Sequence, residues 1–180
     1  MRYLRLFLGL IGFVVQLVPL LAQRELFPPE DLEVIAQKWP QAQRGPMSIR
    51  YIVLQEGQGE PAAPGDRVSV LYQGALLNGK AFDQARDPAH PFVFRVARGD
   101  VIQGWDIAIQ MMREGSKLQV IIPHEMGYGT RGEPPRIPRR ATLVFEIELL
   151  KIERTTTPPP PPPLVVKKKK WWQLSDPKTK

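Results

Sequence analysis

The chain has 180 residues, which suits one domain of ordinary size with extensions, and its apolar fraction of 43% is sufficient for a packed core. It contains no cysteine and only two histidines, which excludes disulfides, thiol catalysis and thiolate metal sites and argues against a histidine-built metal site. The formal net charge of +7 is concentrated at the ends: residues 1–22, 23–45, 46–154 and 155–180 carry +2, −1, +1 and +5, so a basic face for binding nucleic acid is not indicated.

Residues 1–22 have the pattern of a targeting segment. Arg2 and Arg5 precede an almost wholly apolar run that ends at Ala22, and the length of this run lies between that of a signal-peptide core and that of a short membrane helix. Ala22 is a candidate for the residue directly before a cleavage site. Two positions earlier, where a small residue is usual, the chain has the larger Leu20. We therefore expect either a cleaved signal peptide or a retained inner-membrane anchor, and in both cases a periplasmic or secreted location for the rest of the chain.

Residues 23–45 predict a short helix and a linker. Pro28-Pro29 and the acidic pair after them are typical of a helix start, because proline is tolerated in the first turn and carboxylates favour the positive end of the helix dipole. Pro40 ends the predicted helix. We expect this helix to pack on the main domain or to act as a spacer, without a chemical role. Its apolar residues follow helical spacing and form one stripe: Leu32, Ile35, Ala36 and Trp39.

Residues 46–154 predict one domain that is rich in strands. Alternation with a period of two begins at about Ser48, and between residues 142 and 149 every second residue is apolar, which predicts a strand with one buried face. Residues 105–112 predict a short helix, and Asn78-Gly79 marks a tight turn. The pattern predicts an α+β fold in which a strongly curved antiparallel sheet of about five strands packs around one short helix.

Residues 155–180 differ in composition from the domain. Three threonines lead into the proline run 158–163, which predicts a stiff polyproline II spacer of roughly 19 Å at about 3.1 Å per residue. Four consecutive lysines, 167–170, and the pair Trp171-Trp172 follow. Two interpretations stay open for this end: a disordered, solvated tail, or a segment that associates with an anionic membrane surface.

Three blocks of residues carry the strongest functional signal. Residues 79–83 have the sequence GKAFD, residues 101–105 VIQGW, and residues 122–129 IPHEMGYG. Their order and spacing, together with the aromatic residues between them, resemble the FKBP-type peptidyl-prolyl cis-trans isomerases over about residues 48–153, with no large gap or insertion. Several blocks in one order are far more specific than any single motif. The resemblance implies a half-barrel sheet wrapped around a short helix, with the active pocket between helix and sheet.

The resemblance also implies roles for individual residues. Trp105 would form the pocket floor beneath the substrate's prolyl ring. The Ile102 amide and the Tyr128 hydroxyl would donate hydrogen bonds to substrate carbonyls, and Asp83 would be the polar group near the rotating amide. Apolar walls would be formed by Ile102 and by Tyr72, Phe82, Phe92, Val101, Ile137 and Phe145. Seven of these ten residues form the candidate catalytic set: Tyr72, Phe82, Asp83, Ile102, Trp105, Tyr128 and Phe145. The other three form the candidate substrate-binding set: Phe92, Val101 and Ile137.

These residue types suit non-covalent chemistry. Rotation about an Xaa–Pro bond is opposed by amide resonance, with a barrier of roughly 18–20 kcal/mol. The twisted transition state loses resonance and charge separation, so an apolar pocket stabilises it relative to the planar ground state, and fixed donors hold the substrate in a turned conformation. No cofactor or metal is expected. The expected partners are proline-containing polypeptides and, by family resemblance, macrolide-type inhibitors.

An alternative function uses the same groove without efficient turnover. In this interpretation the domain is a substrate-binding chaperone module with low isomerase activity.

Some positions depart from the family pattern. Pro88 stands where better-known members carry an arginine that pairs with the pocket aspartate, and Arg86 is a candidate substitute. We expect His90 to be structural or exposed and His124 to be a solvated loop residue. Four arginines of the loop 129–140 form either an ordinary solvated surface or a basic rim that favours acidic residues beside the target proline: Arg131, Arg136, Arg139 and Arg140.

Overall fold

The computed structural model describes residues 24–155. The predicted targeting segment, residues 1–22, and nearly all of the predicted tail, with its proline run and its lysines, lie outside the described residues. Within residues 24–155, no helix is both long enough and apolar enough to cross a membrane.

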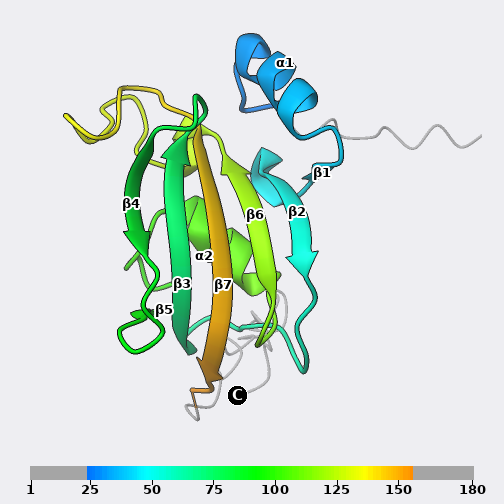
Figure 1. Ribbon diagram of the computed structural model, residues 1–180, viewed down its shortest axis with the longest axis vertical. Coiled ribbons are helices and arrows are strands. Elements are labelled where there is room, and N and C mark those ends of the chain that lie inside the picture. Colours follow the sequence, from blue (N-terminus) through cyan, green and yellow to red (C-terminus); the bar gives the residue numbers. More distant parts are fainter. Residues whose placement is uncertain (1–23, 156–180) are drawn as a thin grey trace, which may run out of the picture.

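One antiparallel sheet of seven strands forms the body of the described region, and a short helix, α2 (Gln103–Gln110), packs on one of its faces (Figure 1). The strand order is β1-β2-β6-β7-β3-β4, and β5 pairs with β3. The bounds of the strands are Gln43–Arg44 (β1), Arg50–Gln55 (β2), Arg67–Leu76 (β3), Ala81–Ala85 (β4), Phe92–Arg95 (β5), Lys117–Ile122 (β6) and Leu143–Glu153 (β7). The predicted curved antiparallel α+β fold is confirmed, with more strands than the five expected, partly because β1 is too short to produce a periodic pattern.

The core lies between the sheet and α2. The alternation predicted for the last strand is confirmed, because Leu143, Ile147 and Leu149 of β7 are completely buried. From the other side, α2 contributes Trp105 and Ile109 to the same core. Two-residue periodicity on the strands and a short apolar helix therefore bury one continuous apolar layer.

A second apolar layer lies on the opposite face of the sheet, under helix α1 (Pro29–Lys38). Ile35 of α1 and the preceding Phe27 are buried against Ile121 of β6 and Val144 of β7. Of the two roles considered for this helix, packing on the domain is therefore the one observed. On this face α1 covers only the end of β6 and β7 around Ile121 and Val144, and Glu146, farther along β7, is exposed.

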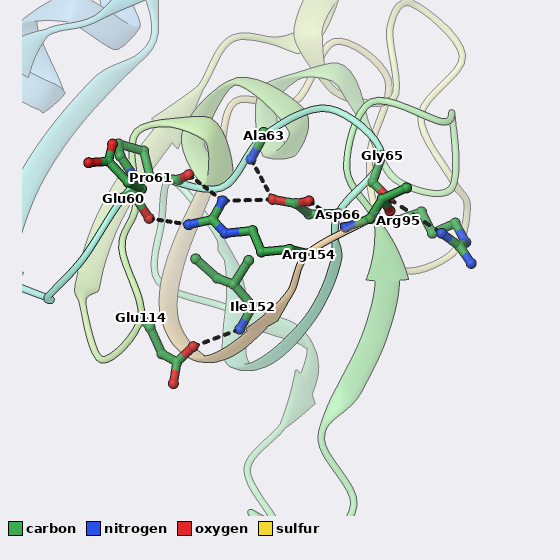
Figure 2. Close-up of polar contacts among 10 residues, drawn as sticks. Glu60, Pro61, Ala63, Gly65, Asp66, Arg95, Glu114, Ile152 and Arg154 are labelled. Carbon is green, nitrogen blue, oxygen red and sulfur yellow. Dashed lines mark hydrogen bonds and ion pairs between the residues drawn. The ribbon is translucent and has the colours of Figure 1, made fainter. Parts of the chain in front are cut away.

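The two residues directly after β7, Arg154 and Thr155, are bonded to the loop before β3 by a network around Asp66, which Figure 2 shows. The Asp66 carboxylate, only 5% exposed, accepts hydrogen bonds from the backbone N–H groups of Ala63 (2.9 Å) and Thr155 (3.0 Å). It also pairs with the Arg154 guanidinium at 2.8 Å, and Arg154 donates to the carbonyl of Pro61 at the same distance. The network satisfies a buried charge and fixes the point at which the chain leaves the domain.

We predict that Asp66→Asn lowers the free energy of unfolding by about 2 kcal/mol at neutral pH, because it leaves Arg154 without its anionic partner and weakens two backbone hydrogen bonds. Burial raises the pKa of Asp66, but hydrogen bonds from Ala63, Thr155 and Arg154 outweigh burial and hold the pKa below its usual value. The carboxylate therefore stabilises the fold fully above about pH 4, and this contribution is lost as the pH falls further.

Denaturant unfolding at neutral pH and at about pH 3 measures both effects. Glu153→Gln removes a carboxylate at the same end of the domain, where its ion pairs with Arg67 and Lys151 are largely exposed, and should change stability little. Equal losses for the two variants would show that the buried network has no special role.

Candidate active site

A cavity of about 180 Å³ opens between α2 and the sheet. A larger hollow of about 620 Å³ beside Arg154 has no aromatic wall and is lined mainly by glutamine, glutamate and glycine, so the smaller cavity is the better candidate for binding an apolar group. Ten residues line the smaller cavity: Tyr72, Phe82, Asp83, Phe92, Asp100, Val101, Ile102, Trp105, Tyr128 and Phe145.

The cavity is built around the indole of Trp105, which is only 4% exposed. The rings of Tyr72, Phe145 and Phe92 meet the indole edge-on, with centroids at 4.9, 5.3 and 6.0 Å. These rings come from β3, β7 and β5, so three strands and α2 converge on one point. The indole Nε1 is buried and has no hydrogen-bond partner within residues 24–155.

Two glycines make this convergence sterically feasible. A Cβ atom on Gly74 of β3 would lie 2.6 Å from Phe145 Cε1 and 2.9 Å from Phe82 Cζ. A Cβ atom on Gly104 in the first turn of α2 would overlap the side chain of Ile122 on β6. Both glycines are needed for close approach rather than for a special backbone conformation, and neither was among the predicted site residues. Gly104 had a signal, since it belongs to the VIQGW block.

Asp83 has a different partner from the one suggested by the sequence. The hydroxyl of Tyr72 donates to Asp83 Oδ2 at 2.7 Å, and the N–H of Gln84 donates to Oδ1 at 2.9 Å. Arg86, the candidate substitute for the family's arginine, bonds to Gln73 instead. The expectation of an arginine partner is therefore wrong for Arg86, because its side chain turns along β3 rather than toward the cavity. Burial, followed by the hydrogen bond and charge of Asp83, raises the pKa of Tyr72 well above its usual value.

Besides the buried indole N–H of Trp105, the two donors expected from the resemblance have no partner within the described residues. One is the backbone N–H of Ile102, which precedes α2 and whose carbonyl already accepts from the N–H of Trp105 at 2.9 Å. The other is the hydroxyl of Tyr128, a residue that is 36% exposed. Burial and the carboxylates of Glu133 and Asp83 raise the pKa of Tyr128, so this hydroxyl keeps its proton throughout the neutral range. Both groups can donate to carbonyls of a bound chain.

The structure brings together nine of the ten residues predicted from the sequence. The exception is Ile137, which is 1% exposed and belongs to the buried core rather than to the cavity lining. Asp100 lines the cavity and was not predicted, since nothing in its sequence surroundings distinguishes it; its carboxylate accepts from the N–H of Arg95 at 3.0 Å. Within residues 24–155, no group of three potential ligands is arranged to hold a metal ion.

Two arginines of the loop after Tyr128 make polar contacts within the loop. Arg136 pairs with Glu133 at 2.8 Å, and Arg139 donates to the carbonyl of Thr130 at 3.0 Å. The ion pair offsets the charge of Arg136, whereas the bond to a carbonyl leaves the charge of Arg139 in place, so the basic rim stays a prediction.

The two histidines occupy different environments. His90 is exposed, as expected, and lies 2.7 Å from a carboxylate oxygen of Asp87. The expectation of a solvated His124 is wrong, because its side chain is only 13% exposed, within the short 3-10 turn His124–Met126 that follows β6.

Comparisons with known proteins agree with this geometry. Residues 58–150 match the family described as FKBP-type peptidyl-prolyl cis-trans isomerase. The chain is 52% identical over 90 residues to the Mus musculus protein named peptidyl-prolyl cis-trans isomerase FKBP2, a match that covers 50% of this chain and 64% of that protein. The chain thus spans less than two thirds of the length of this relative.

A bacterial relative and a solved structure are covered more completely. The chain is 48% identical over 99 residues to a Neisseria meningitidis protein named FK506-binding protein. This match covers 55% of this chain and 91% of that protein. A crystal structure of a peptidyl-prolyl cis-trans isomerase from Pseudomonas syringae superposes with a TM-score of 0.61 at 33% identity, covering 69% of this chain and 92% of that one.

We predict that Gly74→Ala lowers the free energy of unfolding by about 1–3 kcal/mol, because its methyl group would displace the rings of Phe145 and Phe82. Unfolding curves give the loss, and aromatic NMR shifts report the displaced rings. Ala75→Ser adds one atom at the next position of β3, on the other face, and should cost less than about 0.5 kcal/mol. Unchanged ring shifts in Gly74→Ala would contradict the steric role of this glycine.

Proposed function

This chain belongs to the family of FKBP-type peptidyl-prolyl cis-trans isomerases, and we propose that it accelerates rotation about Xaa–Pro bonds in polypeptides. The observation that carries the proposal is the cavity itself. It combines an aromatic floor and walls with two unpartnered donors, Ile102 N–H and Tyr128 hydroxyl, and its lining has no thiol, amine or imidazole. Such a site binds a ring and carbonyls without forming a covalent bond.

The mechanism follows from the polarity of the reacting group. A planar Xaa–Pro amide is stabilised by charge separation, which the twisted transition state loses. Transfer into a cavity with Trp105 as its floor therefore costs the transition state less than it costs the ground state. Donors at Ile102 and Tyr128 hold the chain on either side of the proline, so that binding energy is used for orientation.

Asp83 acts in this proposal as a fixed anionic group rather than as a base. Its carboxylate is bonded by the Tyr72 hydroxyl and by the N–H of Gln84, which leaves it little freedom to reorient. A carboxylate held in this way is a fixed polar group beside the rotating amide and transfers no proton.

The partners that we propose are proline-containing polypeptides and FK506-type ligands, as the names of the relatives suggest. The alternative of a binding chaperone with low isomerase activity uses the same cavity, and turnover measurements separate the two.

We also propose that the chain acts outside the cytoplasm. The support is the charged and apolar pattern of residues 1–22. We propose membrane association through residues 1–22 or through the tail on the same kind of support, the charged and apolar sequence pattern of these two segments.

We predict that the protein accelerates isomerisation of an Xaa–Pro peptide, and that Tyr128→Phe lowers kcat/KM by about tenfold, as expected for loss of one hydrogen bond of about 1–1.5 kcal/mol. A protease-coupled peptide assay measures the rate. The matched control is Tyr51→Phe. Tyr51 lies on β2, away from the cavity, and its hydroxyl donates to Gln43 of β1 at 3.0 Å. Binding of a proline peptide without any acceleration by the wild type would favour the chaperone alternative.

We predict that a fusion of residues 1–155 to alkaline phosphatase is active in bacterial cells, and that Leu10→Arg abolishes this activity by interrupting the apolar run. Sequencing the N-terminus of the exported protein distinguishes cleavage after Ala22 from retention of the segment. Phosphatase activity that Leu10→Arg leaves intact would argue against export by this run.

A further inference from the structure

Helix α1 is bonded to the strand that carries the cavity wall. The hydroxyl of Thr142, a buried residue just before β7, donates to Asp31 Oδ2 in the first turn of α1 at 2.5 Å. This is a short bond to a carboxylate, of the kind that is stronger than a bond between neutral groups. It joins residues that are 111 positions apart in the chain.

Thr142 lies at the base of the loop that begins at Tyr128. The N–H of Arg140 donates to the carbonyl of Gly129 at 3.1 Å and closes this loop next to Tyr128. Fixing Thr142 therefore fixes one stem of the loop, while the other stem carries the free hydroxyl. A Cβ atom on Gly127 would lie 3.0 Å from Leu143, so the two stems are in close contact.

The strands under α1 carry cavity residues on their other face. On β7, Val144 packs under α1, whereas its neighbour Phe145 lines the cavity. On β6, Ile121 packs under α1, whereas its neighbour Ile122 lies against Gly104 at the start of α2. Because side chains alternate across a strand, a helix that packs on one face constrains the position of the other.

We propose that Asp31 is a positioning residue for the isomerase site, acting through Thr142 on the Tyr128 loop and on Phe145. The inference rests on the proposed function. Helix α1 would hold the cavity-lining strands in place from the opposite face of the sheet. Catalysis would depend on the Asp31–Thr142 bond more than on the packing of α1 in general.

The test compares variants of the full chain well below their melting temperatures. Thr142→Val is nearly isosteric and removes only the donor, and it should lower kcat/KM by about fivefold through misplacement of Tyr128. Asp31→Ala should have the same effect, and the double variant should lose no more than either single one, because both remove one bond. Thr142→Ser keeps the hydroxyl and should retain near wild-type kcat/KM.

Two further measurements separate positioning from general stability. Lys38→Met removes the bond from Lys38 Nζ to the carbonyl of Leu77, 2.8 Å long, at the other end of α1, and should leave kcat/KM unchanged. NMR relaxation dispersion should show millisecond exchange at Tyr128 in Thr142→Val but not in Thr142→Ser or Lys38→Met. Wild-type kcat/KM in Thr142→Val, or an equal loss in Lys38→Met, would overturn the proposal. A wild type without isomerase activity would contradict the proposed function, while the Tyr128 exchange would still test the positioning.

Discussion

The packing of aromatic rings around Trp105 is the contact on which the cavity depends. Tyr72, Phe92 and Phe145 approach the indole from three different strands, so the walls of the cavity are also part of the core. Edge-to-face pairs contribute about 0.5–1.5 kcal/mol each beyond the burial of their area. The same ring contacts therefore stabilise both the cavity and the core. Truncation of any of these rings would affect folding as well as binding.

This shared packing also explains why the polar groups at the cavity are few and firmly held. Tyr72 and Asp83 satisfy each other, while Ile102 and Tyr128 present donors to whatever occupies the cavity. The raised pKa values of Tyr72 and Tyr128 mean that neither phenol ionises near neutrality. Both hydroxyls therefore stay protonated through the neutral range, and hydrogen bonding by these two groups should vary little with pH there.

Features encoded in local periodicity or in short motifs were predictable from the sequence, and features that depend on side-chain direction were not. The stripe of α1, apart from the exposed Ala36, and the alternation of β7 follow directly from spacing. The VIQGW block located both the entry to α2 and Trp105. The choice of Tyr72 over Arg86 as the partner of Asp83 depends on which way an arginine turns, and burial of Ile137 depends on how a loop folds back on itself. The bond between Asp31 and Thr142 links distant segments through single polar atoms, and no pattern in either segment indicates it.

The fastening of β7 by Asp66 has a mechanical consequence. Figure 1 shows α1 at one end of the long axis of the sheet and the end of β7 at the other, so the chain enters and leaves the domain at opposite poles. Tension between these poles would load the Asp66–Arg154 network at one end. At the other end it would load the bond from the Ser48 hydroxyl to the carbonyl of Arg24 and the ion pair between Glu25 and Arg50, 2.6 Å long. These contacts lie outside the cavity lining. Pulling on the two ends would therefore load these polar contacts before the aromatic rings of the cavity.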